Sequence, residues 1–108
     1  MARWIAVNLN RGELDGQRVL KRDSYDVLWK HAFAVPQRNW HIGLSWFLAP
    51  FGDDELVMHN GDDDGFTTHL SFVPATRSGI VMMANCDHTS SIKSIFAAAM
   101  GRDPPWGK

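Results

Sequence analysis

The feature that most constrains this sequence is the spacing of its apolar residues in the middle of the chain, where they recur at every second position. Four segments show this strand periodicity or a short apolar run, at residues 42–48, 55–60, 66–72 and 80–84. The turns between them are too short for a crossover connection, so consecutive strands have to run antiparallel. The pattern therefore predicts a four-stranded antiparallel meander. Its last strand, apolar at every position, is expected to be covered on both faces.

Helical periodicity flanks this region on both sides. Residues 3–10 are mostly apolar and end before Gly12, a common helix terminator. Residues 23–36 carry an apolar face at helical spacing, formed by Tyr25, Leu28, Trp29, Ala32 and Phe33. A last helix is expected from about Thr89 to Gly101. The predicted fold class is α+β, with two helices before the sheet near one edge, one C-terminal helix packed on it, and a single domain over residues 1–108.

The composition excludes several classes of protein. A formal net charge of −1 and a pI near 6.5 give no basic face for nucleic acid. The only cysteine, Cys86, cannot form an internal disulfide. No apolar run approaches the roughly 20 residues that span a bilayer, and the start does not read as a signal peptide. No membrane association and no compartment is predicted from these features.

Five tryptophans are many for a chain of 108 residues. Those on periodic segments are expected to be core residues rather than a binding platform. Trp106 follows two prolines and is expected to be a tail residue that either docks or stays loose.

One ordered set of short motifs resembles a known family. His59-Asn60-Gly61 ends a predicted strand, Gly65-Phe66 opens the next, and residues 79–85 read Gly-Ile-Val-Met-Met-Ala-Asn. This order resembles the C-terminal part of the serine β-lactamase-like hydrolases, which include class C β-lactamases, penicillin-binding-protein-like esterases and D-aminopeptidases. The resemblance implies a partial β-lactamase/transpeptidase-like fold and a C-terminal fragment of the family domain.

The resemblance also implies a set of site residues. The third motif of the family is Lys-Thr-Gly, or His-x-Gly in many esterases and peptidases, and here it reads His59-Asn60-Gly61. His59 then takes the place of the basic residue, near the carboxylate or leaving group of an acyl substrate, and Asn60 contacts that substrate. Gly61 lets the substrate lie close to the strand, and Asp62 offers its backbone N–H to the oxyanion. Catalytic roles therefore fall on His59, Gly61 and Asp62, without cofactor or metal.

The other two motifs of the family are missing. The family's nucleophile lies in an early Ser-x-x-Lys, whereas the only such string here, Ser90–Lys93, follows the third motif and starts a predicted helix, where serine is a common cap. The only tyrosine, Tyr25, does not begin a Tyr-x-Asn motif. We therefore expect a fragment of an esterase- or peptidase-type serine hydrolase that is inactive alone. Its partner would be a second copy or a complementary N-terminal portion, with a small acyl or peptide substrate only when the site is completed. The alternative is a non-catalytic self-associating or interaction module on the same sheet.

Two metal sites are weaker alternatives. His59, His69, Cys86 and His88 are zinc-ligand types, and His59 and His69 could share a face if their strands are neighbours, although the spacing matches no common zinc signature. Asn60, Asp62 and Asp64 resemble the opening of a calcium loop. A calcium loop of this kind requires Asp at its first position, Glu at its twelfth and a helix on each side. Here Asn60 and Ser71 stand at those positions between predicted strands, so a solvated acidic turn is expected.

Overall fold

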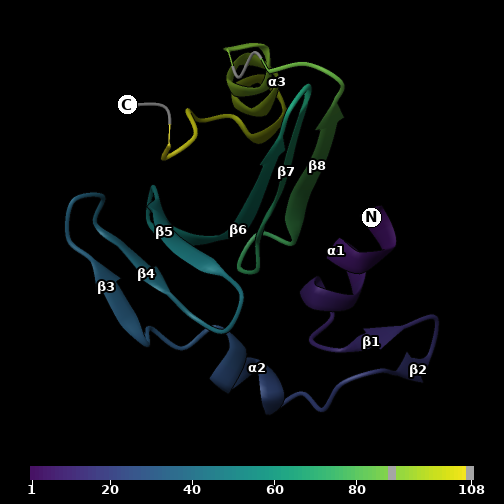
Figure 1. Cartoon of the computed structure of the whole chain (residues 1–108). Helices are drawn as coiled ribbons and strands as arrows, with labels where there is room; N and C mark the ends of the chain where they lie inside the picture. Colours follow the sequence, from purple (N-terminus) through teal and green to yellow (C-terminus); the bar gives the residue numbers. More distant parts are fainter. Residues whose placement is uncertain (88–89, 107–108) are drawn as a thin grey trace.

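The computed structural model describes residues 1–87 and 90–106, and its main feature is an antiparallel sheet with a helix on each face (Figure 1). In the described residues the sheet has six strands in the consecutive order β3-β4-β5-β6-β7-β8, beside a separate two-stranded ribbon β1-β2. The elements are α1 (Ala2–Leu9), β1 (Glu13–Leu14), β2 (Gln17–Arg18), α2 (Ser24–Leu28), β3 (Phe33–Val35), β4 (Trp40–Ile42), β5 (Phe47–Phe51), β6 (Asp54–Asp63), β7 (Phe66–Val73), β8 (Ser78–Ala84) and α3 (Ser90–Met100).

The predicted α+β class and the antiparallel connections are confirmed, and so is the C-terminal helix. Strands β6, β7 and β8 match the last three predicted strands. Helix α1 ends at Leu9, three residues before Gly12, which has a positive φ of 94°. The predicted alternation on β6 also holds. Leu56 and Met58 belong to one buried cluster and Val57 to the cluster on the other face.

The prediction of a helix over residues 23–36 is wrong after Leu28. Residues 33–35 form β3 instead, and Phe33 is 72% exposed. Pro36 disfavours helical backbone at Val35, and the Ala32 N–H donates to the Ile42 carbonyl at 3.0 Å. Pairing with β4 therefore replaces the helical turn that the apolar spacing suggested.

The four-stranded sheet is also corrected, to six strands. The predicted strand at residues 42–48 is interrupted by a bend at residues 43–46, between β4 and β5. Ser45 has a φ of 64° there, and the Gly43 N–H donates to the Trp46 carbonyl at 2.9 Å. A side chain at Gly43 would meet the Leu28 carbonyl oxygen at 2.4 Å, so α2 packs directly against this bend. Because apolar residues stand at every second position on both sides of the bend and within it, the sequence pattern predicted one continuous strand.

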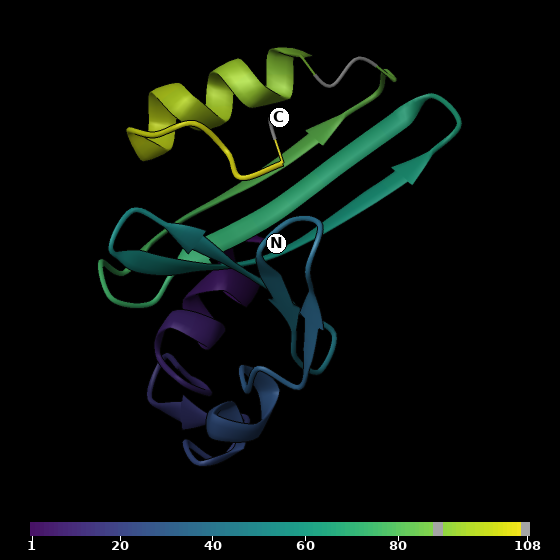
Figure 2. The same cartoon turned by 90° about the vertical axis from the view of Figure 1, so that its left-hand side faces the viewer.

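Helices α1 and α3 lie on opposite faces of the sheet (Figure 2), and a buried cluster of side chains packs on each face. The α1-side core consists of Ile5, Trp46, Leu48, Val57, Leu70 and Phe72. The α3-side core consists of Trp40, Ala49, Leu56, Met58, Val73 and Phe96. Two of the tryptophans, Trp40 and Trp46, are thus core residues as expected, whereas Trp4 is 42% exposed.

Strand β8 is an edge strand and is less covered than predicted. Met83 is 66% exposed, so the expectation of burial on both faces is wrong at this position. Helix α1 does approach the other end of β8 closely, because a Cβ at Gly79 would lie 2.7 Å from the Ile5 side chain. None of the described helices has the length and apolarity that a membrane crossing requires.

Helix α3 offers a matched pair of positions for testing its packing. Ile92 is 5% exposed and Ile95 is 55% exposed on the same helix. Ile92→Val should lower the free energy of unfolding by about 0.5–1.5 kcal/mol in urea titrations, because one buried methylene is lost. Ile95→Val should change it by less than about 0.5 kcal/mol. Equal effects at the two positions would contradict the docking of α3 through Ile92.

Candidate functional site

The last five residues of β6 lie at an open strand edge. Residues 54–58 of β6 pair with β5, and this pairing ends at Phe47–Met58. From His59 to Asp63 the strand pairs, among the described residues, with β7 alone. In an antiparallel strand every second residue directs its N–H and C=O away from the existing partner. Residues 59–63, which contain all four predicted site residues, therefore present backbone donors and acceptors to whatever lies beside them.

The register divides the predicted site residues between the two faces of the sheet. His59 pairs with Leu70 and Gly61 pairs with Thr68, so these residues lie on the α1 side. Asn60 pairs with His69 and Asp62 with Thr67, on the α3 side. The four residues are adjacent along the edge, but they lie alternately on the two faces of the sheet.

His59 borders a hollow on the α1 side, the α1-side hollow, with a volume of about 640 Å³. Most of its lining is apolar and comes from α1, the bend before β5, β7 and β8, including Trp4, Leu44, Trp46, Leu70 and Met83. The His59 ring is exposed, and its centroid lies 5.8 Å from that of Phe47. An exposed imidazole at the rim of an apolar hollow can donate to or accept from a ligand oxygen.

Gly61 is held against the hydroxyl of its cross-strand neighbour. A Cβ at Gly61 would lie 2.7 Å from the Thr68 Oγ1 atom, and that hydroxyl donates to the Gly61 carbonyl at 3.1 Å. Glycine at this position thus leaves room beside the strand for the Thr68 hydroxyl. This geometry is compatible with close approach of a ligand to the strand.

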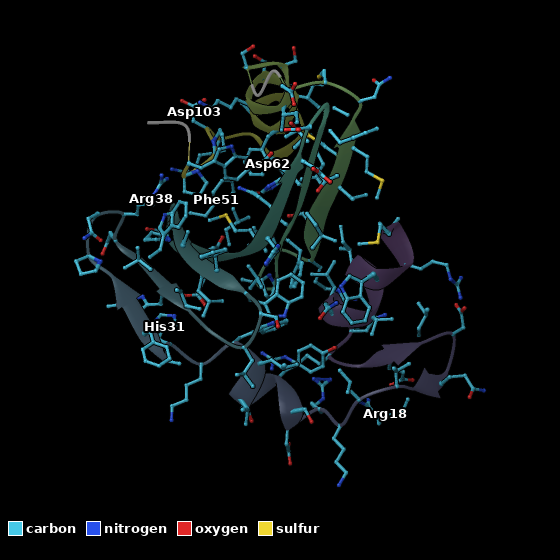
Figure 3. All side chains as sticks on the ribbon, in the orientation of Figure 1. Arg18, His31, Arg38, Phe51, Asp62 and Asp103 are labelled. Atoms are coloured by element: carbon cyan, nitrogen blue, oxygen red, sulfur yellow. The ribbon has the colours of Figure 1, made fainter. Side chains whose placement is uncertain are left out.

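Asn60 and Asp62 border a second hollow, the α3-side hollow, of about 460 Å³. Its lining combines the cations Arg38 and Lys93 with the aromatic rings of Trp40, Phe47 and Trp106. Figure 3 shows Asp62 on the half of the sheet near α3, far from His31 at the opposite end. The turn after Asp62 is anchored, because the Gly65 N–H donates to Asp87 Oδ1 at 2.8 Å.

A buried histidine lies directly behind Asn60. His69 is 3% exposed, its Nδ1 contacts Asn60 Oδ1, and its Nε2 lies 2.9 Å from Ser71 Oγ. Its ring packs on Trp106 and Phe96 at centroid distances of 4.0 and 5.7 Å, so the tail tryptophan is docked. Burial lowers the pKa of His69 from 6.5 to about 4.

The sequence indicated part of this arrangement but not its role. Thr67, His69 and Ser71 stand at every second position of the predicted strand at residues 66–72, and all three are buried. Polar residues on a buried face are hydrogen-bonded in folded proteins, so this alternation was the available signal.

The zinc hypothesis is not supported by the register. Strands β6 and β7 are neighbours, but His69 lies opposite Asn60, so His59 and His69 point to opposite faces and the expectation of a shared face is wrong. His88 lies outside the described residues. Within residues 1–87 and 90–106 no group of three or more His, Cys, Asp or Glu side chains is arranged to hold a metal.

The Ser90–Lys93 string forms the first turn of α3, as expected. Ser90 contributes its carbonyl to the helix, where Ser94 Oγ donates to it at 3.2 Å. The string therefore lies on the helix that covers the α3-side core, on a different element from the edge of β6.

Comparisons with known proteins agree with the resemblance seen in the sequence. The family model described as Beta-lactamase matches residues 1–99. The chain is 26% identical over 95 residues to the unguisins hydrolase ungD' of Aspergillus campestris (strain IBT 28561). The aligned stretch covers 83% of this chain and 17% of that protein. It is 35% identical over 48 residues to the unguisins hydrolase ungD of Aspergillus violaceofuscus (strain CBS 115571), covering 44% of this chain and 8% of that protein. The chain thus spans less than a fifth of the length of either relative.

The low pKa of His69 predicts a specific dependence of stability on pH. Between its unfolded pKa of 6.5 and its folded pKa of about 4, the unfolded chain binds a proton that the folded chain does not. Stability should therefore fall as the pH drops through this window, by at most about 3 kcal/mol from this group. Urea unfolding at pH 7 and pH 4.5 should show a smaller loss in His69→Gln than in the parent. Parallel losses would contradict a neutral, buried His69.

Proposed function

This chain belongs to the Beta-lactamase family, and from that premise we propose that it supplies the substrate-binding strand of a serine hydrolase of the esterase or peptidase type. The reaction would be acyl transfer to a serine, followed by hydrolysis of the acyl-enzyme by water. Both relatives are named hydrolases, which supports hydrolysis as the reaction class. The observation that carries the proposal is the open edge of β6 at residues 59–63.

The open edge suits an extended acyl or peptide substrate. A chain laid beside residues 59–63 would add a strand to the sheet through main-chain hydrogen bonds. Gly61 leaves room for that approach, since it puts no side chain on the face of β6 next to the edge. Asn60, at the same edge, would contact the substrate through its carboxamide.

His59 and Asp62 would act on the reacting group. His59, exposed at the rim of the α1-side hollow, would hold the carboxylate or leaving group of the substrate. The Asp62 N–H would be one of two donors to the oxyanion, a contribution of about 10²–10³ in rate in a complete site. Histidine in the motif favours esters and peptides over β-lactams as substrates.

We propose that this chain is inactive by itself. No Ser-x-x-Lys string precedes His59 and no Tyr-x-Asn string occurs in these 108 residues. The missing groups would come from a complementary N-terminal portion packed over the α1-side hollow. The exposed apolar residues that line this hollow support that placement, among them Leu44 and Met83, which are 54% and 66% exposed.

A second candidate is a non-catalytic module that associates with itself. Two observations favour it: the unpaired edge at residues 59–63 and the exposed Met83 on the edge strand β8. Uncovered edges and apolar patches pair with other chains. The same sheet would then bind a second copy in place of a substrate.

The catalytic proposal predicts reaction only in a completed site. A fluorophosphonate probe should leave the isolated chain unlabelled in intact-mass spectra, because no activated serine is present. An extended form with Ser-x-x-Lys and Tyr-x-Asn upstream should hydrolyse a p-nitrophenyl ester. There, His59→Ala should lower kcat/KM by about 10–10³, whereas His31→Ala, remote from the edge, should not. A stoichiometric adduct on the isolated chain would overturn this assignment.

Self-association makes a separate prediction. At tens of micromolar the isolated chain should sediment as a dimer or larger species, and Met83→Lys should shift it toward monomer by placing a charge on the exposed edge strand. Val27→Lys is the matched control, because Val27 is similarly exposed at 58% but lies on α2. A monomer throughout that concentration range would argue against this second candidate.

A further inference from the structure

We propose that Ser71 and His69 are positioning residues that hold the Asn60 carboxamide in one orientation, with its NH₂ group turned outward to a carbonyl or carboxylate oxygen of a ligand on the open edge. The inference rests on the proposed function of that edge as the substrate-binding strand. It adds two residues to the site from the strand behind it. Both lie on β7, where His69 follows Thr68 directly and Ser71 comes two residues after His69.

The direction of the hydrogen bonds follows from the atoms in contact. Asn60 Oδ1 can only accept, so His69 Nδ1 must carry the proton and donate to it. His69 Nε2 is then an acceptor, and the Ser71 hydroxyl, 2.9 Å away, donates to it. The two hydrogen bonds therefore run in one direction: Ser71 donates to His69, and His69 donates to Asn60 Oδ1.

The surroundings bury the two residues on β7 and keep His69 uncharged. His69 is 3% exposed and Ser71 is fully buried. The rings of Phe96 and Trp106 cover the imidazole. The charged groups that line the same hollow are Asp62 on β6, Arg38 in the β3–β4 turn and Lys93 on α3. Burial lowers the pKa of His69 to about 4, so the ring is neutral near pH 7 and keeps an acceptor for Ser71.

Asn60 is left with a donor group to offer. Its Oδ1 is engaged by His69, while in the described part of the chain no hydrogen bond is formed by its Nδ2. The residue is exposed and lies between His59 and Gly61, at the edge where β5 has ended. Two N–H hydrogens at such an edge match the lone pairs of a carbonyl or carboxylate oxygen.

The order serine, histidine, asparagine does not make Ser71 a nucleophile. Ser71 is 0% exposed and lies between Met58 of β6 and Ile80 of β8 in the sheet. Its hydroxyl cannot reach a substrate carbon, so its effect has to pass through His69 and Asn60. This is a positioning role.

The test is the tautomer of His69 in the full 108-residue chain, read from long-range ¹H–¹⁵N NMR spectra of the imidazole at pH 7. The Nδ1–H tautomer is expected. The Nε2–H tautomer would overturn the proposal, since it requires an inverted Asn60 amide with its oxygen outward. Ser71→Ala should give a mixture of tautomers, and Ser71→Thr should restore Nδ1–H. An unchanged tautomer in Ser71→Ala would show that Ser71 positions nothing.

A matched pair of substitutions tests the contact with Asn60. Asn60→Asp should raise the pKa of His69 by about one unit or more, because a carboxylate then faces Nδ1–H. Asp62→Asn, on the same face two residues along, should leave that pKa within a few tenths of a unit. Equal shifts in the two variants would contradict the contact. None of these measurements needs a substrate or a nucleophile, so they separate this proposal from the hydrolase assignment.

Discussion

The ladder between β6 and β7 determines where most of the molecule lies. Seven residue pairs, from Val57–Phe72 to Asp63–Phe66, place alternate side chains on opposite faces. One set joins the α1-side core and the other joins the α3-side core, so each helix has a prepared apolar surface. Because the ladder continues beyond the end of β5, the same pairing that builds the core also creates the open edge of the candidate site.

The elements that were predictable are those whose local pattern and tertiary pairing agree. Strands β6 and β7 carry alternation, β8 carries a continuous apolar run and α3 carries helical spacing, and turn residues bound all four elements. The predicted helix at residues 23–36 failed because its apolar spacing was correct only as far as Leu28. Beyond it, Pro36 and pairing with β4 favoured extended backbone, which helical spacing alone does not reveal.

The candidate site was visible as residue types but not as an arrangement. The motif His59-Asn60-Gly61 pointed to this strand, because a glycine there would let a substrate lie close to the backbone. The placement of His59 and Asn60 on opposite faces of the sheet depends on register, and the open edge depends on where β5 ends. His69 was noticed as a metal-ligand type. Its burial against Trp106, distant in sequence, is what assigns it to Asn60 instead.

The two-residue turn at Asp64–Gly65 has an evolutionary consequence. With His59 opposite Leu70 and Asn60 opposite His69, inserting or deleting a single residue within either strand would move every residue beyond that point to the other face of the sheet. The apolar and polar residues beyond that point would then be misplaced together. Lineages that keep this sheet should therefore change length at the turn itself, and within the strands only by bulges that restore the alternation of the two faces.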